Sequence, residues 1–271
     1  MCGVTFDSNV WRRVASPIKF PGDPSLLSYQ KLNAACRSGT IQGFLSETTF
    51  TLEQIKRDDR LFWLRSFAHV STTESYVGSN TLKIQASIRS SNVVVPKVTK
   101  IVQDHLNDAY AIGIRILRSK RISVPPNRAL LKDTKYFFNY SSDAEYHLYN
   151  NKYGDIARAL ESMGIGIANI KGKGYANSWN KGRGHWTLGI ATMPDTEKET
   201  VAELVAEWAD ADAIATSIAH GVIYFCTNDV GKGSSNKGIV SAMSPAKSRV
   251  ITSKYGINFI SPDALVVKLG L

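Results

Sequence analysis

Short runs of mostly apolar residues recur along the chain, and polar residues follow each of them. The clearest runs are GVTFD at 3–7, TIQGFL at 40–45, VIYFC at 222–226 and INFI at 257–260. Such runs are typical of strands that are buried on both faces of a parallel sheet. With helical segments between them, they predict an α/β fold with a central, mostly parallel sheet.

Apolar residues at helical spacing fill the segments between these runs. They predict helices at 26–36, 96–119, 152–162, 196–209 and 210–220. A further helix is expected after residue 45, with Thr48 or Thr49 as its cap and Glu53 in its first turn. At the end of the chain, Ser261 and Pro262 are typical of a helix start that follows a strand.

Four acidic residues share one place in this pattern. Asp7 and Asp229 come directly after apolar strands, Asp212 lies at the start of a predicted helix, and Glu53 lies one turn into another. Each alone is explained by a helix cap or a turn. Together they would meet at the carboxyl ends of the strands, where open parallel sheets bind ligands.

Converging carboxylates repel one another, and a divalent cation removes that repulsion. Oxygen ligands without a nearby set of Cys or His fit Mg²⁺ or Mn²⁺ better than Zn²⁺. The cluster therefore predicts a site for one of these two hard cations.

The order of the motifs is similar to that of the PIN-domain nuclease family, which includes toxin ribonucleases and RNA-processing nucleases. The matching segments are FDSNVW at 6–11, SETTFTLEQ at 46–54, DADAIATSIAHGVIYFCTND at 210–229 and SKYGINFISPDAL at 253–265. The resemblance implies a three-layer α/β/α core at 1–66 and 200–271. An inserted α+β segment at 67–199 would separate the two parts.

The same resemblance implies the roles of the site residues. Asp7, Glu53, Asp212 and Asp229 would be the catalytic acids that bind metal. Asn9 and Thr227 would be polar supports beside them, and Asp210 would replace Asp212 if the alignment is shifted by two residues. The implied activity is metal-dependent endoribonuclease cleavage of RNA.

The segment at 171–186 mixes cations, glycines and rings. We expect it to be a basic, glycine-rich loop between a strand at 165–170 and a strand formed by TLGIATM, which begins at Thr187. Cations neutralise phosphates and rings stack on bases, so the loop fits a single-stranded nucleic acid. The alternative is a hairpin tip whose tryptophans pack on the domain. The candidate contacts are Lys171, Lys173, Tyr175, Trp179, Lys181, Arg183 and Trp186.

The net charge of +10 favours a polyanionic partner, nucleic acid first and an anionic membrane surface second. A generally basic proteome would also explain this charge. No apolar run reaches the length of a membrane helix, and three widely spaced cysteines suggest a reducing, cytoplasmic setting.

Two other functions remain compatible with the sequence: a structure-specific DNA nuclease of the flap or 5′ type, and a non-catalytic RNA-binding protein with a vestigial acidic site. The resemblance also allows an inhibitory, antitoxin-like protein partner, and the sequence leaves a homodimer open.

Overall fold

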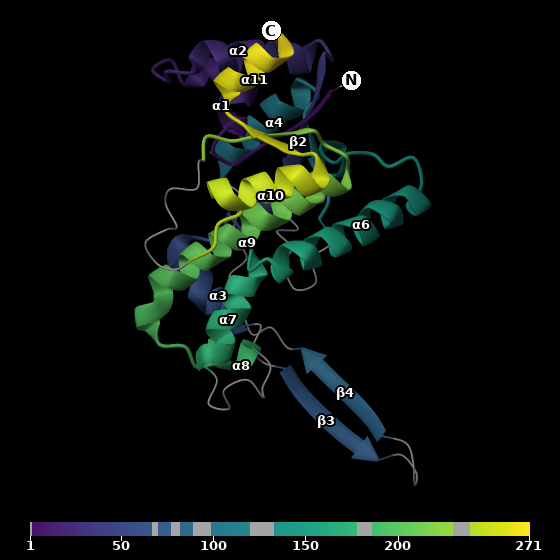
Figure 1. Cartoon of the computed structure of the whole chain (residues 1–271), viewed down its shortest axis with the longest axis vertical. Helices are drawn as coiled ribbons and strands as arrows, with labels where there is room; N and C mark the ends of the chain where they lie inside the picture. The colour runs from purple at the N-terminus through teal and green to yellow at the C-terminus, as the bar shows by residue number, and fades with distance from the viewer. Residues whose placement is uncertain are drawn as a thin grey trace.

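The computed structural model describes residues 2–66, 70–76, 82–88, 99–119, 133–177, 186–229 and 239–271, the two ranges at 70–76 and 82–88 without side chains. The central sheet has five strands in the order β5-β2-β1-β6-β7, and every pairing is parallel. Its strands are β1 (Cys2–Phe6), β2 (Ile41–Ser46), β5 (Arg115–Leu117), β6 (Tyr224–Cys226) and β7 (Asn258–Ile260). The α/β class is confirmed, and the sheet is wholly parallel. β3 (Val70–Tyr76) and β4 (Leu82–Ile88) form a separate antiparallel pair (Figure 1).

Strand β1 lies at the centre of the sheet. It pairs with β2 from Cys2 opposite Ile41, and with β6 from Val4 opposite Tyr224. The backbone N–H of Asp7 donates to the carbonyl of Cys226 at 2.9 Å. The carboxyl ends of β1 and β6 are therefore side by side, and whatever follows these two strands shares one edge of the sheet.

Helices cover both faces of the sheet. On one face, Val4 and Phe6 pack with Trp11, Tyr29 and Leu265. The helices on this side are α1 (Trp11–Ala15), α2 (Leu26–Arg37), α4 (Lys100–Ala111) and α11 (Pro262–Leu269).

On the other face, Phe225 packs with Ile214, Ile218 and Ile251. The helices there are α6 (Asp143–Ser162), α9 (Lys198–Ala219) and α10 (Pro245–Tyr255). The architecture is a three-layer α/β/α fold.

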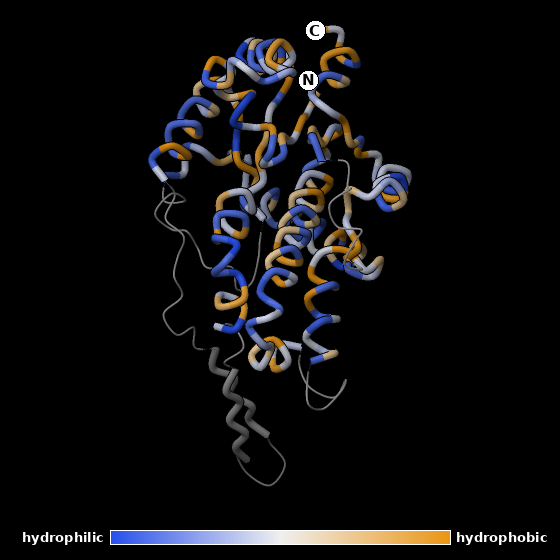
Figure 2. The backbone as a smooth tube through the Cα atoms, turned by 90° about the vertical axis from the view of Figure 1, so that its left-hand side faces the viewer, coloured by the Kyte–Doolittle hydropathy of each residue, from blue (hydrophilic) through white to orange (hydrophobic). Residues whose placement is uncertain are grey.

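A third apolar cluster lies beyond the sheet. The first half of α9 packs there against α3 (Arg60–Ser66), α7 (Ile167–Asn177) and α8 (Trp186–Ala191), with Trp63, Ile170 and Ile190 buried between them. Figure 2 shows hydrophobic and hydrophilic positions alternating along the helical segments, as expected where each helix buries one face. None of the described helices is long and apolar enough to cross a bilayer.

The prediction of two helices at 196–209 and 210–220 was wrong, because α9 runs without a break from Lys198 to Ala219. Asp210 and Asp212 therefore lie inside a helix and cap nothing. Ser46, not Thr48 or Thr49, caps a 3₁₀ helix at Glu47–Phe50, and Glu53 follows it in a turn.

The predicted helix at 96–119 is α4 and then strand β5, separated at Gly113, whose φ is +90°. Both elements belong to the three-layer core, although they come from the segment assigned to the insertion.

The strands predicted at 165–170 and in TLGIATM were also wrong. These residues fall largely in α7 and α8, so the described residues form no hairpin here. Gly174 lies where α8 packs on α7: a Cβ at this position would come within 2.3 Å of the Trp186 carbonyl oxygen. This glycine serves helix packing, not a loop.

Candidate metal centre

Three carboxylates meet at the carboxyl edge of the sheet. Asp7 directly follows β1, Glu53 lies in the turns that follow β2, and Asp210 projects from α9. One oxygen from each lies within 4.8 Å of the others. The three side chains could thus share a single cation.

Asp7 is held in place by three donors. The backbone N–H of Ser8 donates to Oδ1 at 2.7 Å, and Asn9 Nδ2 and Thr227 Oγ1 donate to Oδ2 at 2.9 and 2.6 Å. Asn9 Nδ2 also lies 3.3 Å from Thr227 Oγ1. The structure thus brings both predicted polar supports into contact with Asp7, and their donors orient its carboxylate.

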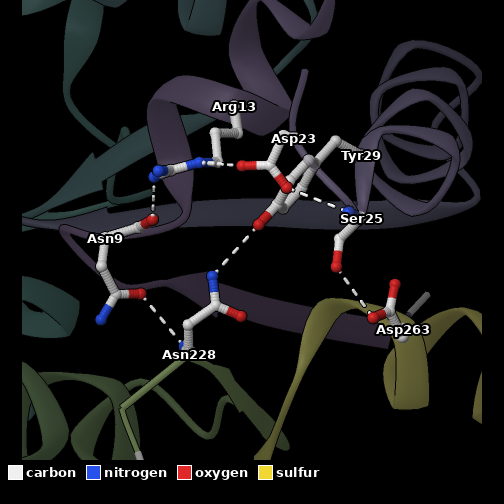
Figure 3. Close-up of polar contacts among 7 residues, drawn as sticks. All are labelled: Asn9, Arg13, Asp23, Ser25, Tyr29, Asn228 and Asp263. Carbon is white, nitrogen blue, oxygen red and sulfur yellow. Dashed lines mark hydrogen bonds and ion pairs between the residues drawn. The ribbon is translucent and has the colours of Figure 1, made fainter. Parts of the chain in front are cut away.

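A wider network holds Asn9 and Asn228, the residue after Thr227 (Figure 3). The backbone N–H of Asn228 donates to Asn9 Oδ1 at 3.1 Å, and its side chain donates to the Tyr29 hydroxyl at 3.1 Å. Arg13 donates to the Asn9 carbonyl at 2.6 Å and pairs with Asp23 at 2.6 Å. The loops after β1 and β6 are therefore fixed to each other and to α2.

Burial and neighbouring negative charges raise the pKa of each carboxyl in the cluster. For Glu53, burial first and then the charge of Asp7 raise the pKa to about 7. For Asp210, burial, Asp7 and Glu53 raise the pKa well above its ordinary value. The pKa of Asp7 is also raised, mainly by burial, although its bond from Thr227 opposes this.

Two nearby arginines offset only part of the repulsion between the three carboxylates. Arg12 and Arg60 favour the charged form of Glu53, yet burial lowers the pKa of both guanidinium groups. Arg60 donates instead to the carbonyls of Ile55 at 3.2 Å and Ala202 at 2.5 Å. Among the described residues, no ion pair joins either arginine to the cluster.

Asp229 lies at the rim of the cluster. It is exposed, and its backbone N–H donates to Thr227 Oγ1 at 2.9 Å. Its charge raises the pKa of both Asp7 and Asp210. The structure thus brings Asp229 near Asp7 and Asp210 without including it in the 4.8 Å set.

Asp212 lies elsewhere. Two residues along a helix correspond to a rotation of about 200°, so Asp210 and Asp212 face different surroundings. The Asp212 carboxylate is buried and accepts a hydrogen bond from the Tyr153 hydroxyl at 2.7 Å. Asp212, Tyr153 and Trp208 line a cavity of about 250 Å³ between α6, α7 and α9. Of the two candidate acids, the structure places Asp210 in the cluster.

Glu207 was not among the site residues predicted from the sequence. It precedes Asp210 by about one turn of α9, is only 9% exposed, and its charge raises the pKa of Asp210. Its Oε2 has no hydrogen-bond partner among the described residues. The sequence did contain a signal for Glu207. If residues 198–219 are taken as one helix, Glu203, Glu207 and Asp210 stand at positions i, i+4 and i+7 and share one face of it.

The basic and aromatic candidates are divided. Lys171 pairs with Glu161, and Lys173 with Glu197 at 3.1 Å, so both cations are already neutralised. Tyr175 is 40% exposed on α7, and Trp186 packs against the third apolar cluster. The remaining candidates, Trp179, Lys181 and Arg183, lie outside the described residues.

Comparison with known proteins found no match to a family model, a curated protein or a solved structure. The resemblance to PIN-domain nucleases therefore stays a prediction from the motifs, and the function must be argued from the site.

Proposed function

We propose that this protein is a Mg²⁺- or Mn²⁺-dependent nuclease that hydrolyses phosphodiester bonds in RNA. The observation behind the proposal is the convergence of Asp7, Glu53 and Asp210, whose oxygens lie within 4.8 Å of one another. Three partly or fully buried carboxylates so close together are costly without a cation. All three donors are hard oxygens, as Mg²⁺ and Mn²⁺ prefer.

Asp7, Glu53 and Asp210 would hold the cation, and Asp229 would complete the site from its rim. A bound cation of this kind supplies an activated water and neutralises charge on the phosphate. Asn9 and Thr227 keep the Asp7 carboxylate oriented. With a pKa of about 7, the Glu53 carboxyl is protonated in a large fraction of the molecules at neutral pH. It would release this proton when a cation binds.

The choice of RNA comes from the order of the motifs and from the net charge of +10. A strongly positive net charge attracts polyanions such as nucleic acids. DNA cleavage and binding without cleavage are the two outcomes that would replace this assignment.

A cleavage assay on mixed single-stranded RNA and DNA tests the proposal. Mg²⁺, Mn²⁺ and EDTA are compared for the parent protein, Asp7→Asn and the control Asp104→Asn, which removes one exposed carboxylate from α4. Asp7→Asn should lower the rate of RNA cleavage at least about 100-fold, because the cation loses one of its ligands. RNA binding should persist, because the substitution removes a negative charge that would repel the phosphates. The control should cleave like the parent.

Metal-dependent cleavage of DNA in preference to RNA would reassign the substrate. RNA binding without product under every metal condition would make the protein a non-catalytic binder. Unchanged RNA cleavage in Asp7→Asn would place the active site elsewhere.

A further inference from the structure

A pocket of about 330 Å³ opens next to the metal centre, between the carboxyl ends of β6 and β7 and the first turns of α10. Thr227 and Asp229 belong to both places: they line the pocket, Thr227 donates to Asp7, and the charge of Asp229 acts on Asp7 and Asp210. A molecule in this pocket would therefore lie directly beside the candidate catalytic acids.

The pocket combines an apolar wall with a cation. Met243, Phe259 and Ile260 supply the apolar part, and Phe259 is only partly buried. Ser248 and Ser261 add hydroxyl groups.

Arg249 is exposed on α10 and forms part of the lining. Among the residues that the structure describes, no carboxylate forms an ion pair with it. This contrasts with Lys171 and Lys173, whose charges are already paired. An unpaired guanidinium presents a planar fork of donors that matches a phosphate group.

We propose that this pocket holds the nucleotide next to the scissile phosphate of the bound RNA. The base or ribose would pack on Phe259 and Ile260, and a flanking phosphate would contact Arg249. The position of this nucleotide relative to the cleaved bond rests on the proposed function, since the metal centre defines which bond is cut. The pocket itself predicts a contact with RNA that does not depend on cleavage.

The test measures binding in the Asp7→Asn background without added metal, so that cleavage does not enter. A short fluorescein-labelled single-stranded RNA is titrated and followed by fluorescence anisotropy at several salt concentrations. Arg249→Ala is compared with Lys254→Ala, which removes one exposed cation from the other end of the same helix and does not line the pocket.

We expect Arg249→Ala to weaken binding about tenfold, and to make the slope of log K against log salt shallower by about 0.7, the loss of one phosphate contact on a single strand. Lys254→Ala should change affinity less than about twofold. Arg249→Lys should recover part of the loss, because a point charge still attracts a phosphate without the bidentate geometry.

A second measurement examines the apolar wall. Single abasic sites are placed at successive positions of the RNA, and the affinity of each probe is measured. One position should lose affinity more than its neighbours, since only one base reaches the wall.

In the cleaving protein, Arg249→Ala should raise KM with kcat little changed, because the contact is made in both ground and transition states. Equal losses for Arg249→Ala and Lys254→Ala, or a uniform response to abasic sites, would overturn the pocket assignment. Neither result depends on the cleavage experiment with Asp7→Asn, so the pocket and the nuclease activity can fail separately.

Discussion

Asp210 and Asp212 occupy the same helix and differ in what surrounds them. Asp210 faces Asp7 and Glu53, and its pKa is raised by burial and by their charges. Asp212 accepts a hydrogen bond from Tyr153 on another side of α9. At the scale of single residues, one carboxylate therefore belongs to the candidate cation site, and the other joins α9 to α6 through a hydrogen bond.

Alanine at each position separates these roles. Asp210→Ala should reduce metal-dependent cleavage at least about 100-fold. Without metal, its free energy of unfolding should stay the same or increase, because a source of repulsion is removed. Asp212→Ala should retain cleavage but lower the free energy of unfolding by about 1–3 kcal/mol, since the buried Tyr153 hydroxyl loses its acceptor.

Urea unfolding and the cleavage assay, run on both variants, measure the two effects. Loss of cleavage in Asp212→Ala together with full cleavage in Asp210→Ala would reverse the assignment of the two acids.

At the scale of the element, two glycines in α7 show whether the close contact between α7 and α8 requires a residue without a side chain. A Cβ on Gly174 would lie 2.3 Å from the carbonyl oxygen of Trp186, which is backbone and cannot move aside cheaply. Gly174→Ala should therefore lower the free energy of unfolding by about 1–3 kcal/mol.

Gly172 on the same helix is the matched control. It is exposed, and nothing lies within 4 Å of a Cβ there, so Gly172→Ala should raise the free energy of unfolding by about 0.5–1 kcal/mol through helix propensity alone. Chemical denaturation of both variants gives the comparison. Similar stabilities for the two would mean that α8 does not pack on Gly174 as closely as described.

The same elements show how far the sequence alone could reach. The apolar runs at 3–7, 40–45 and 257–260 predicted strands correctly, because buried parallel strands are written as continuous apolar segments. Strand β5 stayed hidden, since its three residues continue the apolar pattern of α4 and only Gly113 marks the break. The basic residues and glycines of α7 have the composition of a loop, yet the segment is a helix whose buried face is formed by Ile170 and Gly174.

For the candidate site, the sequence could place acids at strand ends but could not set the rotation of α9. Asp7 follows β1 directly, so its position depends only on where the strand ends. Whether Asp210 or Asp212 reaches Asp7 depends on the helical phase. That phase is set by the whole of α9 packing on α3, α6 and the sheet, which no local pattern determines.

At the scale of the whole molecule, the fold brings residues 7, 53 and 210 to one edge of the sheet and stores repulsion there. In the unfolded chain Glu53 titrates near 4.5, and in the folded protein its pKa is about 7. Between these values the folded state holds a proton that the unfolded state has lost. This group therefore stabilises the fold fully below the lower value, and the stabilisation is lost as the pH rises through about 7.

Metal-free protein should accordingly lose stability between about pH 5 and about pH 8, with Glu53 contributing on the order of 3 kcal/mol. Glu53→Gln isolates this contribution, because its neutral amide cannot titrate, and its unfolding free energy should change less over the same range. Thermal and urea unfolding at a series of pH values provide the measurement, and the difference between parent and variant cancels the titrating groups that lie outside the cluster.

A divalent cation should act in the opposite direction. Mg²⁺ or Mn²⁺ at about 100 times its Kd would raise the free energy of unfolding by about 2.7 kcal/mol, and most effectively above neutral pH, where Glu53 has already released its proton. Asp7→Asn should abolish this gain at every pH. If added metal left the Tm of the parent unchanged at about pH 8, the three carboxylates would not form a cation site. If Glu53→Gln retained the parent's pH dependence, that dependence would not come from the raised pKa of Glu53.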